Sequence, residues 1–170
     1  MLKLRPISDN DCRLLWEWVN EPQSRAFAFN SEAISWDEHS EWFRKKRSDP
    51  DCLILILTDE QNSPVGQVRF DMEPGDKAEI AITIASGYRG LGYGVECIRL
   101  ACEYLRRRKA VAEVIAHIKL ENTVSIQAFR KAGFAPTREV QQVKGQEALK
   151  LVWHCPSLQL PSPLEVPPDD

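Results

Sequence analysis

Residues 78–94 read AEIAITIASGYRGLGYG, and this stretch determines the fold that we expect. Isoleucines recur at every second position over residues 80–84, while Glu79 and Thr83 lie on the opposite face, which is the pattern of a β-strand. After Gly94 the apolar residues recur at helical spacing. The sequence therefore predicts a buried strand that leads into a helix through a glycine-rich turn.

The glycine-rich turn is suited to binding an anion. Glycines at positions 90, 92 and 94 allow backbone conformations that other residues avoid, and they leave the amide groups unobstructed. The helix that follows directs its free N–H groups and the positive end of its dipole at the turn, and Arg89 adds a positive charge. The spacing fits neither a P-loop nor the Gly-x-Gly-x-x-Gly motif of dinucleotide folds. We expect a pyrophosphate here, with a turn that binds nothing as the alternative.

Length and composition indicate a single soluble domain. The chain has 170 residues, of which 43% are hydrophobic and 28% charged, and its net charge is -3, so nothing favours nucleic acid or a membrane surface as partner. Its five cysteines include no Cys-x-x-Cys pair, which favours reduced thiols over a disulfide framework or a zinc site. No apolar leader or membrane-spanning run is visible. We expect a cytoplasmic protein without a metal, present as a monomer or homodimer.

The remaining pattern predicts an α/β fold with a mixed sheet of about seven strands and helices on both faces. The predicted strands are 2–6, 53–57, 65–70, 78–84, 111–118, 137–143 and 148–153. The predicted helices begin at Ser8, Ser35, Gly92 and Asn122, the first of them ending at residues 20–22, and residues 25–34 form a loop or broken helix. Residues 1–154 form the domain, and residues 155–170, with five prolines, form an extended tail.

Two motifs in this order of elements resemble the GCN5-related N-acetyltransferase (GNAT) superfamily over about residues 1–153. They are Arg89-x-x-Gly92-x-Gly94 after the central strand and Asn122-x-x-Ser125-x-x-x-Phe129-x-x-x-Gly133-Phe134 on the last helix. The resemblance implies acetyl-CoA as cosubstrate, with main-chain groups of the central strand beside the pantetheine arm and amides of the turn on the pyrophosphate. The cofactor-binding residues that it implies are Ile82, Thr83, Ile84, Arg89, Gly90, Leu91, Gly92, Tyr93, Gly94, Val95, Asn122, Ser125 and Phe129.

The sequence departs from the superfamily at Phe129. Many members have a tyrosine there, whose phenol is thought to protonate the leaving thiolate, and phenylalanine has no proton to donate. Either Ser125 or a water supplies the proton, or the thiolate leaves unassisted, which a thiol pKa of about 8.5 makes tolerable.

A narrower resemblance concerns the acceptor. Residues 30–43 and 66–71 resemble acetyltransferases that modify an amino group on a nucleotide-linked sugar in pseudaminic acid biosynthesis. Other near relatives acetylate protein N-termini, including those of ribosomal proteins, and a non-catalytic acyl-CoA-binding module is a third possibility. We expect the sugar nucleotide as partner.

The alternative to an acceptor site in this region is a purely structural role. Trp36, Trp42 and Phe43 at helical spacing are expected to be core residues, and His39 a surface or capping residue. Arg69 and Asp71 could simply pair with each other on the surface.

Two residues are candidates for the general base that deprotonates the acceptor amine. Glu79 lies near where several members carry a catalytic glutamate, and His117 lies on the next strand and titrates near neutral pH without tuning. The alternative is that Glu79 is a solvated strand residue and His117 a hydrogen-bonded core residue. We favour Glu79 because it lies on the strand that would hold acetyl-CoA, with water relaying the proton.

Overall fold

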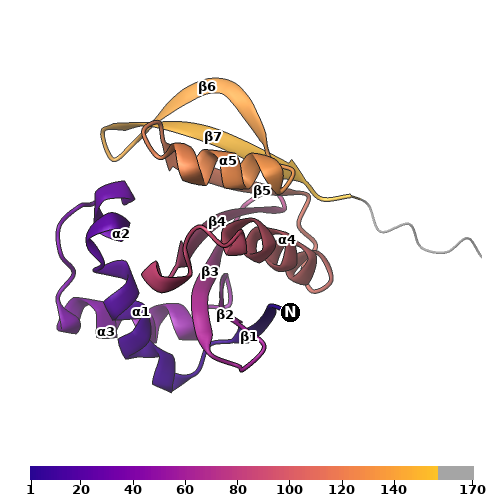
Figure 1. Ribbon diagram of the computed structural model, residues 1–170. Helices are drawn as coiled ribbons and strands as arrows, with labels where there is room; N and C mark the ends of the chain where they lie inside the picture. Colours follow the sequence, from indigo (N-terminus) through magenta and orange to yellow (C-terminus); the bar gives the residue numbers. More distant parts are fainter. Residues whose placement is uncertain (157–170) are drawn as a thin grey trace, which may run out of the picture.

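A computed structural model describes residues 1–156 and contains one mixed seven-stranded sheet (Figure 1). The strand order is β1-β2-β3-β4-β5-β7-β6, and only β4 and β5 are parallel. The strands are β1 (Lys3–Pro6), β2 (Cys52–Thr58), β3 (Pro64–Glu73), β4 (Lys77–Ile84), β5 (Glu113–Lys119), β6 (Ala135–Val143) and β7 (Gln146–His154). The α/β prediction and the strand count are confirmed. The predicted tail lies outside the described residues except for Cys155 and Pro156.

Helices cover both faces of the sheet, as expected. They are α1 (Cys12–Val19), α2 (Pro22–Phe27), α3 (Trp36–Ser48), α4 (Tyr93–Arg106) and α5 (Thr123–Lys131), with short 3-10 turns η1 (Asp9–Asp11) and η2 (Ser86–Tyr88). Figure 1 shows α1, α2 and α3 grouped together, apart from α4 and α5. No helix within residues 1–156 is both long enough and apolar enough to cross a bilayer.

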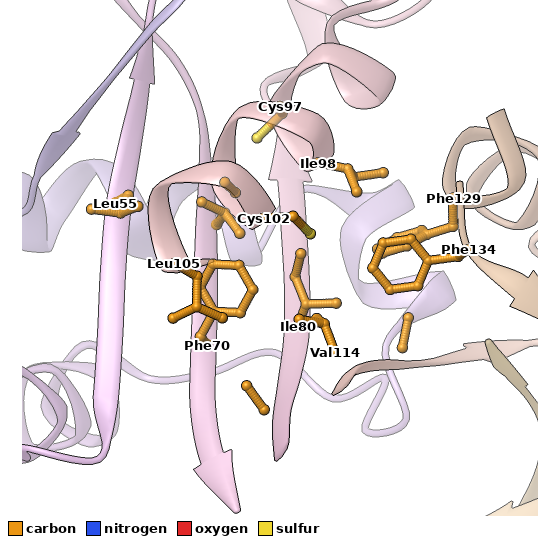
Figure 2. Close-up of a cluster of buried hydrophobic side chains, with 14 of the residues drawn as sticks. Leu55, Phe70, Ile80, Cys97, Ile98, Cys102, Leu105, Val114, Phe129 and Phe134 are labelled. Carbon is orange, nitrogen blue, oxygen red and sulfur yellow. The ribbon is translucent and has the colours of Figure 1, made fainter. Parts of the chain in front are cut away.

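The main core lies between the sheet and the pair α4 and α5 (Figure 2). One face of the central strands contributes Phe70, Ile80 and Val114, which are at most 4% exposed. The apolar side of α4 covers them with buried residues that include Cys97, Ile98, Cys102 and Leu105. A smaller core on the opposite face joins α1 and α3 to β2 through Leu15, Trp18, Phe43, Ile54 and Ile56. The alternation in β4 therefore directs its isoleucines at α4 and leaves Glu79 on the face of α1 and α3.

Two predicted helix starts have the geometry of a capping box. The main-chain N–H of Ser8 donates to Asp11 Oδ2 at 2.7 Å, and that of Ser35 donates to Glu38 Oε2 at 3.0 Å. Glu38 returns its own N–H to Ser35 Oγ at 3.3 Å. These bonds satisfy N–H groups that have no partner inside the helix, so the local sequence favours a helix start at both positions.

The predicted end of the first helix at residues 20–22 is confirmed, since α1 ends at Val19 with Asn20 as its C-cap. A further helix, α2, then begins at Pro22, because the first turn of a helix needs no N–H from that residue. Two other predictions about the helical region were wrong. His39, expected to be a surface or capping residue, is 2% exposed because it faces α1, where its Nε2 lies 2.9 Å from the carbonyl oxygen of Cys12. Trp36, expected in the core, is 41% exposed at the start of α3, whereas Phe43 is buried.

Candidate active site

The sheet opens between its two parallel strands. β4 and β5 pair only over Lys77–Glu79 and Glu113–Ile115. Beyond this point β4 stays paired with β3 as far as Ile84, and β5 stays paired with β7 as far as Lys119. The result is a split in the middle of the sheet with β1 to β4 on one side and β5, β7 and β6 on the other.

Main-chain groups of β4 line the split. The N–H of Ala85 donates to the Val65 carbonyl oxygen at 3.0 Å, so alternate residues of β4, including Thr83, direct their main-chain groups at β3. The main-chain N–H and carbonyl groups of Ile82 and Ile84 therefore face the split. The Arg89 Nε, which donates to the Ile84 carbonyl oxygen at 2.9 Å, agrees with this assignment. Thr83, expected to share in main-chain pairing with a ligand, directs its main chain away because strand residues alternate.

The glycine turn lies at the open end of β4 and leads into α4. Gly90 has a φ of 79° and Gly92, the N-cap of α4, a φ of 80°, a region that favours glycine. Gly94, for which we expected the same need, is inside α4 and has no positive φ. Leu91 is 61% exposed between them. The turn thus exposes main chain at the N-terminus of a 14-residue helix, which is a suitable place for an anion.

The side chain of Arg89 is engaged inside the protein. It forms an ion pair with Glu21 at the start of α2, and its Nη1 donates to Gln23 Oε1 at 2.8 Å. We expected this guanidinium to add a free charge to the anion site. Because Glu21 neutralises it, the turn attracts an anion through its amides and the helix dipole instead.

The two candidate bases lie in contact where the split begins. His117 Nδ1 is 3.1 Å from Glu79 Oε1, and His117 Nε2 is 2.9 Å from Gln141 Oε1 of β6. The hydrogen bond to Glu79 raises the pKa of His117 above its usual value of 6.5, and the Gln141 contact adds to it, although burial opposes both. The Glu79 side chain is 42% exposed and that of His117 only 15%. Gln141, on an edge strand far along the chain, carries no sequence signal that would have identified it.

A cluster of charged side chains lies beside the candidate bases on the same face of the sheet. Lys46 Nζ of α3 is 2.6 Å from Asp71 Oδ1, and Arg69 Nε is 2.8 Å from Asp71 Oδ2. The Arg69 guanidinium also lies 5.5 Å from the centre of the Trp42 ring. Arg69 pairs across β3 and β4 with Ala81, which is exposed although it lies on a central strand. The exposed position at Ala81 therefore adjoins a cluster in which Lys46 and Arg69 share Asp71, and Lys46 Nζ also lies 3.9 Å from Asp49 Oδ2.

The far side of the split carries the second motif. Asn122 Oδ1 accepts the main-chain N–H of Ser125 at 3.2 Å, so the expected N-cap role is confirmed. Ser125 is half-buried one turn into α5. Phe129 is 3% exposed and packs edge-on against Phe134 at 5.0 Å (Figure 2). Phe129 thus belongs to the core, and its ring offers no polar atom to the split.

A mixed sheet that splits between parallel central strands, next to a glycine turn and a helix N-terminus, defines the fold class of the GCN5-related N-acetyltransferases. The acetyltransferase (GNAT) domain profile matches residues 1–135, and the chain belongs to this family.

The chain is also similar to individual proteins. An uncharacterized protein of Methanocaldococcus jannaschii is 30% identical over 142 residues, which are 80% of this chain and 28% of that protein. The chain spans 28% to 40% of the lengths of the curated relatives that it matches.

Two solved structures share the fold at low identity. The Vibrio cholerae spermidine N-acetyltransferase in complex with CoA and spermine has a TM-score of 0.82 at 20% identity, over 91% of this chain and 95% of that one. An aminoglycoside acetyltransferase in complex with coenzyme A has a TM-score of 0.77 at 16% identity, over 91% and 95%.

Proposed function

We propose that this acetyltransferase domain moves an acetyl group from acetyl-CoA to a primary amine. The observation that carries the proposal is the split between β4 and β5, with Glu79 and His117 in contact at its closed end. The amide groups of a pantetheine arm can pair with Ile82 and Ile84 as a neighbouring strand would. The amides of residues 89–95 then bind the pyrophosphate.

The second motif faces the arm from the other side in this proposal. Asn122 and Ser125 lie beside the pantetheine and the thiol. The amine nitrogen forms a bond to the thioester carbon, the carbon–sulfur bond breaks, and the CoA thiolate leaves. Because Phe129 has no hydroxyl, Ser125 or a water returns a proton to the sulfur.

Glu79 is the better candidate for the base, and His117 for the residue that positions it. Both ring nitrogens of His117 already face protein oxygens, whereas Glu79 Oε2 has no hydrogen-bond partner within residues 1–156. If His117 donates from Nδ1 to Glu79, it holds that carboxylate towards the split. An acceptor ammonium then gives its proton to Glu79, directly or through water, before the nitrogen attacks.

The guanidinium of Arg69 beside Ala81 supports an amino sugar linked to a nucleotide as the acceptor. Asp71 and Asp49 together balance the charges of Lys46 and Arg69, so the argument depends on the planar guanidinium group, which recognises phosphates well, and not on a surplus of charge. Trp42 offers an aromatic surface at the same place. The aminoglycoside acetyltransferase that shares the fold is a precedent for aminated sugars as acceptors.

A thiol-release assay tests the proposal. Acetyl-CoA is combined in turn with amino-sugar nucleotides, N-terminal peptides, spermidine and an aminoglycoside, and free CoA is measured. We expect turnover with amino-sugar nucleotides. Turnover of peptides alone would identify an N-terminal acetyltransferase, and CoA binding without any turnover would identify an acyl-CoA-binding module.

The pH profile of kcat/KM tests the assignment of the base. We expect Glu79→Gln to lose the acidic limb of the profile while calorimetry gives unchanged acetyl-CoA affinity. A normal profile in Glu79→Gln, with a loss of roughly a hundredfold in His117→Ala, would transfer the role to His117.

A further inference from the structure

Residues 21–29, which we call the strap, cross the split and are attached on both sides of it. The N-terminal end of the strap meets Arg89 beside the glycine turn. Its C-terminal end accepts two side-chain hydrogen bonds from the far side of the split. Lys119 Nζ of β5 donates to the carbonyl oxygen of Ala26 at 3.1 Å, and Gln146 Nε2 of β7 donates to that of Phe29 at 2.8 Å.

The strap contributes nothing to the buried core. None of residues 21–29 is buried, although their neighbours Trp18 and Lys119 are 6% exposed. A segment without buried apolar side chains opens at low free energy unless polar contacts hold it. The position of the strap therefore depends on its hydrogen bonds and its ion pair.

Arg89 forms most of the contacts at the N-terminal end. Its Nε donates to the Ile84 carbonyl oxygen at 2.9 Å, and its two Nη atoms reach Gln23, Ser24 and Glu21. Glu21 Oε1 also accepts the main-chain N–H of Ser86 at 3.4 Å. The pair is mostly shielded, since the Arg89 side chain is 27% exposed and that of Glu21 is 21% exposed. One guanidinium thus connects the end of β4 and the start of the turn to the strap.

The strap lies on the face of the sheet that holds the candidate bases. Lys119 and His117 are two residues apart on β5, so their side chains point to the same face. Lys119 contacts the strap and His117 contacts Glu79. Movement of the strap would therefore change the face of the split where Glu79 and His117 lie and where we propose that the acceptor amine binds.

We propose that Arg89 is a positioning residue that couples ligand binding at the turn to the order of the strap. The proposal rests on the proposed binding of CoA at residues 89–95. A ligand that orders the main chain of Arg89 restricts its side chain, and the side chain holds Glu21. Because coupling between sites is reciprocal, a ligand that orders the strap also strengthens CoA binding.

Hydrogen exchange of the whole chain with and without saturating CoA tests this coupling, and it needs no known acceptor. Mass spectrometry follows peptides from the turn (residues 89–95), the strap (residues 21–29) and α3. In the wild type we expect CoA to slow exchange about fivefold or more in both the turn and the strap, and to leave α3 unchanged. In Glu21→Gln we expect the slowing to persist in the turn and to disappear from the strap.

Glu17→Gln is the matched control, because it removes the same charge from an exposed pair with Arg13 on α1. It should behave as the wild type does. Gln23→Ala, which removes a neutral partner of Arg89, should reduce the slowing in the strap if Glu21→Gln fails to fold.

Each outcome separates the two proposals. Slowing in the turn without slowing in the wild-type strap would overturn the coupling and leave the CoA site intact. Equal slowing of the strap in wild type and in both variants would show that Arg89 does not transmit the effect. No calorimetric binding of CoA to the wild type would overturn the site and the coupling together.

Discussion

At the scale of single residues, the contact between Glu79 and His117 explains how two side chains from different strands act as one unit. Parallel pairing brings the strands together for three residues only; Glu79 is the last paired residue of β4, and His117 lies two residues beyond the last paired residue of β5. The carboxylate stabilises the charged imidazolium, which is why the pKa of His117 is raised.

This pair makes stability depend on pH in a definite direction. The folded-state pKa of His117 is above its unfolded value of 6.5, so its contribution is complete below about pH 6.5 and is lost as pH rises through the folded pKa. The free energy of unfolding of the wild type should exceed that of Glu79→Gln, and we expect this difference to be about 0.5 to 1 kcal/mol larger at pH 6 than at pH 9. Urea unfolding of both proteins at several pH values measures this difference.

Glu113→Gln provides the comparison. Its partner His154 lies 3.7 Å away with a side chain that is 74% exposed, so solvent screens that pair. A pH dependence as large in Glu113→Gln as in Glu79→Gln would contradict our explanation.

Among the secondary-structure elements, the glycine turn and the start of α4 place different structural requirements on two nearby glycines, Gly92 and Gly94. Gly92 ends the turn in a left-handed conformation, and a Cβ there would meet no atom within 4 Å. Gly94 is helical, and a Cβ there would make ordinary contact with Ala128 of α5 at 3.9 Å. The constraint at Gly92 is therefore conformational, and Gly94 lies where α4 approaches α5.

The two glycines should respond differently to alanine. Gly92→Ala places an L-residue in the left-handed region and should cost about 1 to 2 kcal/mol of unfolding free energy. Gly94→Ala should be neutral or stabilising by up to ~1 kcal/mol, since alanine favours the helix. Thermal and urea unfolding of both variants checks this, and equal destabilisation would refute it. In a folded Gly92→Val we also expect weaker acetyl-CoA binding by calorimetry, because the amides would be displaced.

At the scale of the whole molecule, the split leaves two parts of the sheet joined by short strand pairing, the helices and the strap. A ligand that pairs with β4 and contacts α5 would join them directly. At a CoA concentration of 100 times Kd, binding to the folded state alone stabilises by about 2.7 kcal/mol.

The melting temperature should therefore rise by about 5 to 11 °C with saturating CoA. Adenosine diphosphate, which lacks the pantetheine arm, should give a smaller shift at a matched concentration. The same shift with both ligands would mean that the arm does not enter the split, whereas no shift with CoA would argue against the site.

Local patterns predicted most of the elements because their causes are local. Period-two isoleucines, two capping boxes and the glycine turn each act within a few residues of chain, so β4, α3 and α4 appear close to where they were expected. Pro22 shows the limit of this reasoning, because proline both ends and begins helices and only the following turn decides which.

The fold class, the central strand with its turn, and the motif residues from Arg89 to Phe129 follow from the pattern of amino acids alone. How these residues are used depends on contacts between elements that are distant in the chain. The register of β4 and β5 ends their pairing at Glu79 and Ile115, and this joins Glu79 to His117. The pairing of β4 with β3 turns the main chain of Thr83 away from the split. Glu21 lies 68 residues from Arg89 along the chain and neutralises its charge. Such contacts depend on chain-distant elements packing together, and no short-range pattern encodes them.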